Sequence, residues 1–281
     1  MTARTPASPA RPHPELARAG AVLRALADAM RAAPTSLPPG VPDPEAADAR
    51  LAEGIPALAG EPLLTWEDLV RNAGAVASAL APTEAGPAAA LGVRQLASAN
   101  GLDRAGLVEA ALAGVRDELP LAGLPDLDPD ALAAVLDFAA RPALRAAAAA
   151  LAATLAARLA VVPWERGQCP ACGAPPTLSV IRGAEHERRL HCARCGTGWA
   201  FPRVRCPACG ERDHARLGHL HAVGEGEYRR VEVCDSCHGY LKSVALLDAP
   251  DADRLLELDL ETAALDFLAL ERGYTRAAAG Y

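Results

Sequence analysis

All eight cysteines of this 281-residue chain lie between residues 169 and 237, where they form four Cys-x-x-Cys pairs. The pairs are Cys169 with Cys172, Cys192 with Cys195, Cys206 with Cys209, and Cys234 with Cys237. A Cys-x-x-Cys turn presents two thiolates on one side of a tight loop, and two such turns facing each other form a tetrahedral four-sulfur cage. The cysteines therefore predict two metal ions, each held by two consecutive pairs.

An internal repeat supports the consecutive pairing. Cys-Pro-Ala-Cys-Gly occurs at residues 169–173 and again at 206–210, and an Arg-Arg pair precedes the closing Cys-x-x-Cys in both copies. An aromatic residue, Trp199 or Tyr240, follows each closing pair. This repetition predicts tandem ribbons of the zinc-ribbon or rubredoxin type with one metal ion each.

A metal ion bound by four cysteines usually has a structural role. Zinc and iron both accept four thiolates, so the sequence leaves the choice between them open. When cysteine fills every position, no coordination position remains for water or substrate, which predicts a protein that is not an enzyme. Disulfides and a thioredoxin-like redox pair are the alternatives; the first suits small secreted chains, and the second needs a strand-to-helix turn around the cysteines.

The elements around the cysteines indicate an α+β chain. A proline-rich tail is expected over residues 1–13, a bundle of four to six helices over 14–160, and the tandem metal ribbons over 161–245. A C-terminal helix and tail follow over 246–281, with helical spacing from 251 to 272.

Local signals mark several of these elements. Thr65 and Asp68 resemble a capping box, Asp128-Pro129 is typical of a helix start, and Pro142 is expected to open a last long helix. Strands are expected at residues 177–181, 188–191, 215–223 and 228–233.

Composition narrows the possible partners. The net charge of −7 disfavours non-specific nucleic-acid binding by the whole chain, so proteins are the expected partners. Neither an export signal nor an apolar run of about 20 residues is recognisable, which predicts a cytoplasmic protein without membrane insertion. Of the 28 basic residues one is lysine, Lys242.

The cysteine-rich part resembles the formate dehydrogenase accessory protein family, FdhE, over about residues 160–277. The residues that carry this resemblance are Trp164, Gly167-Gln168-Cys169-Pro170-Ala171-Cys172-Gly173, Leu190-His191-Cys192, Trp199, Arg203, Arg205-Cys206, Cys209-Gly210, Glu232-Val233-Cys234-Asp235, Cys237, Tyr240-Leu241-Lys242, Leu265-Asp266, Glu271, Gly273-Tyr274 and Arg276. The chain departs from the family where an Asp-Asp pair is replaced by Leu258-Asp259. Lys242 occupies the lysine position of the family's Tyr-Leu-Lys motif, which indicates a place where arginine does not substitute.

The resemblance implies an accessory factor for respiratory formate dehydrogenase that binds the catalytic subunit in the cytoplasm before export. Aromatic and basic residues beside the closing pairs have the composition of interface anchors. Trp199, Arg203, Tyr240 and Lys242 are therefore the predicted partner contacts, with packing over the metal cages as the alternative role for the two aromatic residues. A nucleic-acid-binding zinc ribbon and a rubredoxin-like redox protein are the alternative functions.

Overall fold

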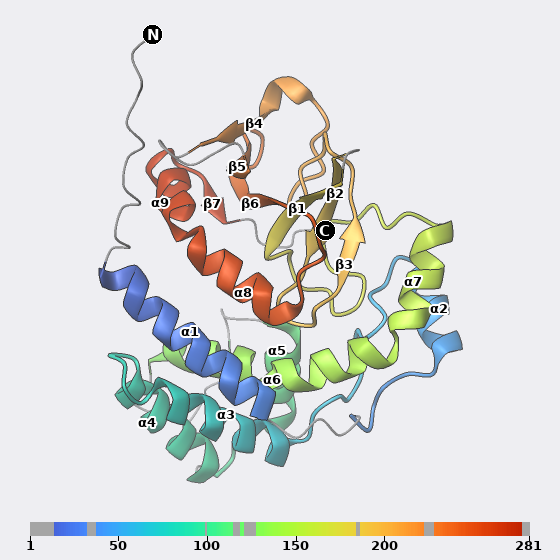
Figure 1. The fold of residues 1–281 in the computed structure, drawn as a ribbon. Helices are drawn as coiled ribbons and strands as arrows, with labels where there is room; N and C mark the ends of the chain where they lie inside the picture. The colour runs from blue at the N-terminus through green and yellow to red at the C-terminus, as the bar shows by residue number, and fades with distance from the viewer. Residues whose placement is uncertain are drawn as a thin grey trace.

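The computed structural model describes residues 14–32, 38–98, 100–114, 119–120, 128–183, 186–221 and 228–276. Helices occupy the part before residue 162, a mixed sheet follows, and two further helices pack against that sheet (Figure 1). This arrangement confirms the predicted α+β class. The expected tail over residues 1–13 lies outside the described residues.

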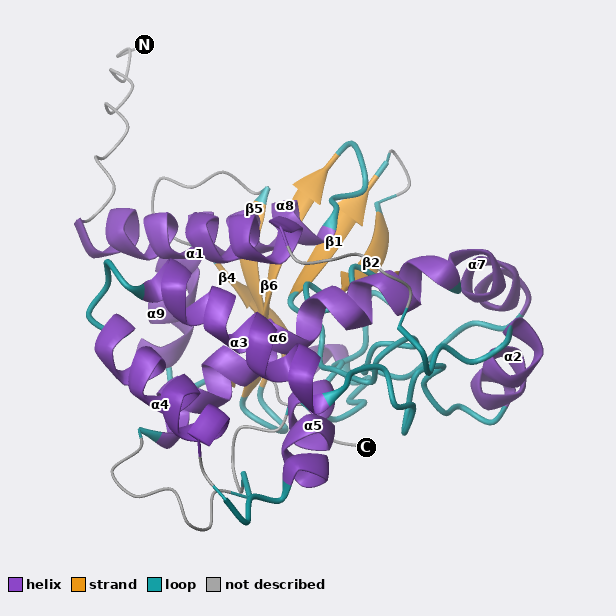
Figure 2. Ribbon diagram, turned by 90° about the horizontal axis from the view of Figure 1, so that it is seen from below, coloured by secondary structure: helices purple, strands orange, loops and turns teal. Residues whose placement is uncertain are grey.

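The helical part surrounds one long buried helix, α6. Its described helices are α1 (Pro14–Ala32), α2 (Pro44–Ala52), α3 (Trp66–Leu80), α4 (Gly86–Ser98), α5 (Arg104–Ala113), α6 (Pro129–Ala150) and α7 (Ala152–Val161). Two predicted starts are confirmed: the Thr65 hydroxyl accepts the Asp68 N–H at 3.1 Å, and Asp128 caps α6. Figure 2 shows α2 and α7 together at one side of the molecule, away from α1 and α4.

The expected helix start at Pro142 is wrong, because that proline lies inside α6. Leu136, Ala139 and Leu144 on either side of it are buried in the core, and their packing holds a continuous helix across a residue that lacks an N–H. The helix ends instead at Leu151, where the backbone leaves helical geometry and α7 continues at an angle of 63°.

No single helix in the described ranges is long and apolar enough to cross a membrane, whereas α6 and α7 taken together pass that test as one bent pair.

The two ribbons share one sheet. Its described strands are β1 (Leu178–Arg182), β2 (Glu187–His191), β3 (Gly198–Ala200), β4 (Leu217–Leu220), β5 (Arg229–Cys234), β6 (Gly239–Leu246) and β7 (Thr275–Arg276). The order is β3-β2-β1-β6-β5-β4, with β7 beside β6. The parallel pairing of β1 with β6 joins the first ribbon to the second.

The strand expected over residues 215–223 is shorter in the structure. Asp213 caps a turn of 3₁₀ helix over His214–Arg216, and only Leu217–Leu220 pairs with β5. Residues 222 and 223 lie outside the described residues.

The single helix expected over residues 251–272 is two helices, α8 (Ala252–Glu261) and α9 (Ala263–Glu271). The Thr262 hydroxyl donates to the Leu258 carbonyl at 2.6 Å, and Thr262 leaves helical geometry between the two helices. Back-bonding of this kind bends helices. The break lets α8 pack beside α1 while α9 covers β4, β5 and β6.

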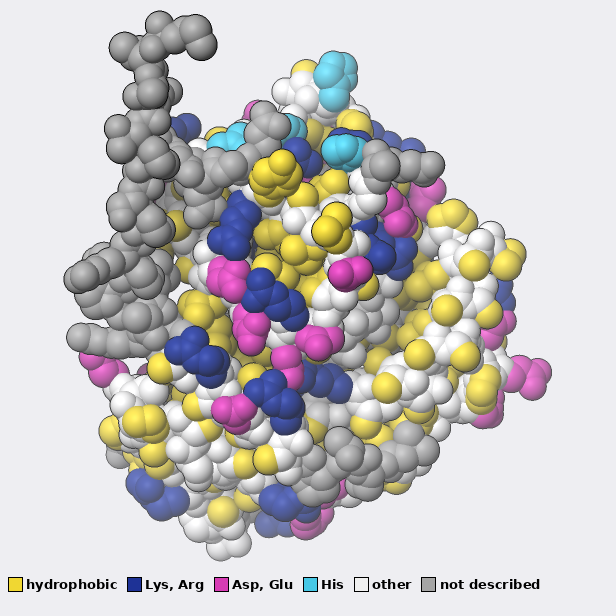
Figure 3. All heavy atoms as spheres, viewed as in Figure 1, with side chains coloured by type: hydrophobic (Ala, Val, Ile, Leu, Met, Phe, Trp, Pro, Cys, Tyr) yellow, Lys and Arg dark blue, Asp and Glu magenta, His cyan; other side chains and the backbone are white. Residues whose placement is uncertain are grey.

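The hydrophobic core is continuous across the expected boundary near residue 160. One cluster contains Leu69 and Leu136 from the helical part together with Leu190, Trp199 and Leu241 from the sheet. At the surface, acidic and basic side chains are interspersed along the junction of α1 and α8 (Figure 3), where Arg31 pairs with Asp253. The proposed division into a helical domain and a ribbon domain thus describes two parts that share buried side chains.

Gly167, which precedes the first cysteine pair, lies where the backbones of the two ribbons approach closely. A Cβ atom at this position would lie 1.7 Å from the carbonyl oxygen of Pro207. We expect Gly167→Ala to lower the free energy of unfolding by about 1–3 kcal/mol, because overpacking against backbone forces a displacement. Urea denaturation checks this.

Gly74 is the matched control, because it lies inside α3 and a Cβ there would meet no atom within 4 Å. Gly74→Ala should leave stability unchanged or slightly higher, since alanine favours helix. Equal losses in both variants would contradict the close approach.

Candidate metal centres

The cysteine turns have a common backbone geometry. In the first, Gly173 N–H donates to the Cys169 carbonyl at 2.9 Å, and Cys169 N–H donates to the Ala174 carbonyl at 2.8 Å. The same two hydrogen bonds recur in the turns that begin at Cys192 and Cys206. These bonds hold each turn rigid, so that both sulfurs of a pair point to the same side.

Glycine follows the second cysteine in three of the four pairs, because the backbone at that position has a positive φ. Gly173, Gly196 and Gly210 have φ values of +77°, +85° and +74°, a conformation that glycine adopts without strain. The fourth turn places His238 there at φ +54°. Its carbonyl accepts the Thr275 N–H at 2.8 Å, which ties this turn to β7.

The eight sulfurs gather in two groups of four, and within each group they lie within 4.8 Å of one another. The groups join Cys169, Cys172, Cys192 and Cys195, and Cys206, Cys209, Cys234 and Cys237. This is the consecutive pairing that the repeat predicts.

The spacing of the sulfurs fits a tetrahedral metal ion. Two Sγ–Sγ separations in the first group are 3.5 and 3.6 Å, and two in the second are 3.6 and 3.7 Å. Four sulfurs at zinc–thiolate bond length stand about 3.8 Å apart in a regular tetrahedron. Both groups could therefore hold a metal ion, and the donor set fits zinc and iron alike.

The first group has the electrostatics of a site that needs a cation. Burial raises the pKa of the Cys169 thiol, whereas hydrogen bonds from the three neighbouring cysteines lower the pKa of Cys192. A divalent ion bound by the four sulfurs would displace thiol protons, because the thiolate is the metal ligand.

The first cage is part of the main core, while the second lies at the outer end of the sheet. All four sulfur-bearing residues of the first cage belong to or pack against the cluster that spans the helices. Ala57 and Leu58 donate their backbone N–H groups to the carbonyls of Pro170 and Ala171 at 2.8 and 2.9 Å. The segment before α3 is therefore held against the first cysteine turn by backbone hydrogen bonds.

Arg194, between the third and fourth cysteines, fixes the same cage from the other side. Its guanidinium donates to Asp137 in α6 at 2.6 Å and to the carbonyls of Ala111 and Leu112, near the end of α5, at 2.7 and 3.0 Å. Asp137 also accepts a hydrogen bond from Arg141 at 2.6 Å. Sequence reasoning missed this residue, although an arginine between two metal-binding cysteines and a lone acidic residue in an apolar helix stripe were the available signals.

The predicted partner contacts do not share a surface. Trp199 is fully buried, with its indole N–H 3.3 Å from the Arg166 carbonyl, and Tyr240 and Lys242 are 4% and 1% exposed. Arg203 alone is exposed. The burial of the two aromatic residues agrees with the alternative role of packing: Trp199 packs in the main core beside the first cage, and Tyr240 packs against α9.

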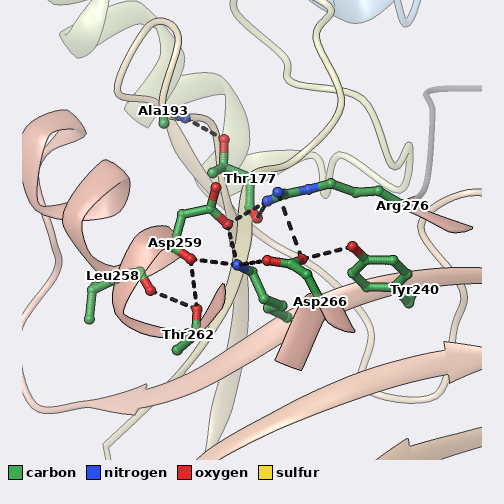
Figure 4. A network of polar contacts seen from close by, with 9 residues as sticks. Thr177, Ala193, Tyr240, Leu258, Asp259, Thr262, Asp266 and Arg276 are labelled. Atoms are coloured by element: carbon green, nitrogen blue, oxygen red, sulfur yellow. Dashed lines mark hydrogen bonds and ion pairs between the residues drawn. The ribbon is translucent and has the colours of Figure 1, made fainter. Parts of the chain in front are cut away.

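The buried Lys242 contacts Asp259 and Asp266, which belong to the polar network between the sheet and the C-terminal helices that Figure 4 shows. Its ammonium lies 2.5 Å from the Asp259 carbonyl oxygen, 2.9 Å from the Asp259 carboxylate and 2.5 Å from the Asp266 carboxylate. A compact ammonium with three donors matches three converging oxygens, which accounts for lysine at this position.

The network continues from Lys242 toward both cages. Tyr240 donates to Asp266 at 2.7 Å. Burial is the larger cause and this hydrogen bond the second cause that raises the pKa of the tyrosine hydroxyl. Arg276 donates to Asp259 at 2.5 Å and to the Thr177 carbonyl at 3.0 Å, and Thr177 accepts the N–H of Ala193 inside the first cage at 2.9 Å. Figure 4 shows these contacts in one continuous chain. The C-terminal residues that resemble the FdhE signature thus hold the two ribbons together.

Comparisons with known proteins agree with this geometry. Residues 168–203 match the model of the FdhE central domain, and residues 204–281 match that of the FdhE C-terminal domain. A protein FdhE homolog from Pseudomonas aeruginosa is 33% identical over 246 residues, which cover 83% of this chain and 73% of that protein. Another from Stutzerimonas stutzeri is 40% identical over 113 residues, which cover 39% of this chain and 36% of that protein.

A solved structure extends the likeness to nearly the whole chain. The crystal structure of the FdhE protein from Pseudomonas aeruginosa superposes with a TM-score of 0.62 at 30% identity, over 95% of this chain and 88% of that one. The agreement therefore includes the helical part, which the two domain models do not reach. The chain belongs to the FdhE family.

Proposed function

We propose that this protein is an accessory factor for respiratory formate dehydrogenase, and that it binds the catalytic subunit of that enzyme in the cytoplasm before export. Membership of the FdhE family carries the proposal. The two four-cysteine groups agree with a binding role, because four thiolates leave no coordination position for a substrate. In this proposal the metal ions hold the sheet rigid, and side chains on the protein surface bind the catalytic subunit.

The test uses a bacterial host that lacks its own FdhE protein but makes a respiratory formate dehydrogenase. We expect the tagged chain to restore formate-dependent dye reduction and to co-purify with a catalytic subunit whose export signal is still uncleaved. Because the first cage joins the helices to the sheet, Cys172→Ser is expected to abolish both. Full formate dehydrogenase activity without any FdhE protein, or restoration by a chain that never contacts the catalytic subunit, would contradict the proposal.

A further inference from the structure

Two neighbouring cavities lie on the sheet, beside the second cage. Their volumes are about 280 and 340 Å³, and both are lined by Arg203, His219 and Arg230. We call the two together the sheet-face groove. Its further lining includes Leu217, Glu232 and Leu241 in the first cavity and Ile181, Tyr228 and Ser243 in the second.

The groove lies on the face of the sheet that points away from α9. Arg230 is paired directly with Ser243, and His219 with Glu232, and paired residues of antiparallel strands share a face. Val231, next to Arg230 in the chain, packs against α9 on the opposite face. In the view of Figure 3, histidine side chains gather at the upper end, over the part of the sheet that holds β4.

Positive charge is in surplus among the described residues that line this groove. The carboxylate among them, Glu232, forms an ion pair with the buried Arg188. Arg230 approaches Glu232 only to 3.8 Å, and Arg203 is exposed without an ion-pair partner among the described residues. Two guanidinium groups therefore have most of their hydrogen-bonding capacity free.

Two buried polar atoms on the same lining also lack partners. The hydroxyl of Ser243, a residue 1% exposed in the second cavity, and the Nε atom of Arg205 in the first have no hydrogen-bond partner within the described part of the chain. Buried polar groups are nearly always satisfied, so two unsatisfied polar atoms in the walls of these cavities indicate a lining that is more polar than a packed core.

We propose that the sheet-face groove binds an acidic, extended segment of a partner protein. Carboxylates of that segment pair with Arg203 and Arg230, which line both cavities together with His219. Val204 and Tyr228, 52% and 73% exposed, offer apolar contacts for the intervening side chains. If the proposed function holds, this segment belongs to the catalytic subunit of formate dehydrogenase.

An extended polypeptide fits the groove better than a nucleic acid or a free anion. Single-stranded nucleic acids bind through tracks of cations and several stacked aromatic residues, whereas the described lining of this groove has one exposed aromatic residue, Tyr228, and a carboxylate in its wall. A small phosphate would fill only a fraction of two neighbouring cavities of about 280 and 340 Å³.

Fluorescence anisotropy of the full-length, metal-loaded protein tests this proposal. The probe is a fluorescein-labelled ten-residue peptide of alternating glutamate and valine, and the matched control peptide has lysine in place of glutamate. We expect the glutamate peptide to bind and the lysine peptide not to bind. The affinity for the glutamate peptide should fall about ten-fold in Arg203→Gln and further in the double variant Arg203→Gln/Arg230→Gln, because each substitution removes a positively charged partner.

The control variant, Arg94→Gln/Arg272→Gln, removes two exposed arginines that lie outside the groove, and its affinity should stay within about two-fold of wild type. Arg203→Gln keeps the test decisive should the double variant fold poorly, because its side chain is exposed and makes no ion pair within the described residues. Equal binding by the groove and control variants, tighter binding of a ten-residue oligothymidine than of the peptide, or full displacement of the peptide by inorganic phosphate at an equal concentration would each overturn the proposal.

Co-purification with the catalytic subunit separates this inference from the proposed function. Groove variants that lose the acidic peptide support the groove even when wild-type protein fails to capture the catalytic subunit, and that failure overturns the proposed function alone. Capture that weakens with the peptide in Arg203→Gln supports both.

Discussion

Replacing Cys172 with serine should leave the chain with one metal ion instead of two and destabilise the helices as well as the sheet. Three sulfurs remain in the first cage after this substitution, and a missing thiolate opens the site. The cage lies in the cluster that contains Leu69 and Leu136 of the helical part, and Arg194 ties it to α5 and α6. We expect the free energy of unfolding to fall by more than about 4 kcal/mol, the range reached when a metal site is lost.

Cys209→Ser is the matched control, because it removes the corresponding sulfur from the second cage. That cage has none of its cysteines in the main cluster, so its loss should remove one metal ion and loosen the outer strands while the helices persist. Helical circular dichroism followed through thermal unfolding, together with metal analysis by mass spectrometry, distinguishes the two variants. An identical loss of helix in both would contradict the different roles assigned to the cages.

The same preparations identify the metal. A four-sulfur iron site absorbs visible light and bleaches on reduction, whereas a zinc site is colourless. Wild-type protein purified without added metal should contain two ions per chain, as its two groups of four sulfurs predict. One ion, or none, would contradict the pairing of the cysteine turns.

The cysteine pairing could be predicted from sequence because it depends on local geometry. The turns that begin at Cys169, Cys192 and Cys206 are closed by their own backbone hydrogen bonds, and a following glycine such as Gly173 supplies the positive φ that these turns require. Helix caps such as Thr65 and Asp128 were predictable for the same reason, since their partners lie within three residues. A repeat of such local units then indicates which turns face each other.

Long-range packing could not be predicted in this way. Trp199 follows a Cys-x-x-Cys turn and has an indole N–H at one end, and both features are also typical of an exposed interface residue. Its burial becomes evident only when residues of α6 and the segment near Arg166 are placed around it. The break at Thr262 depends on α1 and β5 lying beside α8 and α9, and Arg194 finds its partners 57 or more residues away. Alanine-rich helices also hide their buried faces, because alanine occupies both buried and exposed positions.

Replacing Lys242 with methionine should lower the free energy of unfolding by about 3–5 kcal/mol, because it leaves carboxylates partly buried without their ammonium partner. Asp259 and Asp266 are each 22% exposed at the side chain and both face Lys242. Arg276 remains beside Asp259 but is 41% exposed and does not fill the centre of the network. Lys242→Arg should also destabilise, since a planar guanidinium does not fit a site shaped around an ammonium.

Compensating substitutions test whether the cost is electrostatic. Adding Asp266→Asn to Lys242→Met removes one of the stranded charges and should recover part of the lost stability, whereas Asp266→Asn alone should be destabilising. The exposed Arg94→Met serves as a control for removal of a positive charge and should change stability by less than about 0.5 kcal/mol. Additive losses in the double variant would indicate that Lys242 acts through packing.

The pH dependence gives an independent check on the same network. Burial alone would raise the pKa of Asp259, but Arg276 and then Lys242 hold it below its ordinary value. A carboxyl group with a lowered pKa contributes its full stability above its unfolded pKa, about 3.9, and loses it only as the pH falls through the lower folded value. The stability difference between wild type and Lys242→Met should therefore stay constant between about pH 6 and 8, where Asp259 is ionised in both the folded and the unfolded state. A difference that changed through this range would contradict the ionised state assigned to Asp259, since the contacts of Lys242 in the described part of the chain include no histidine.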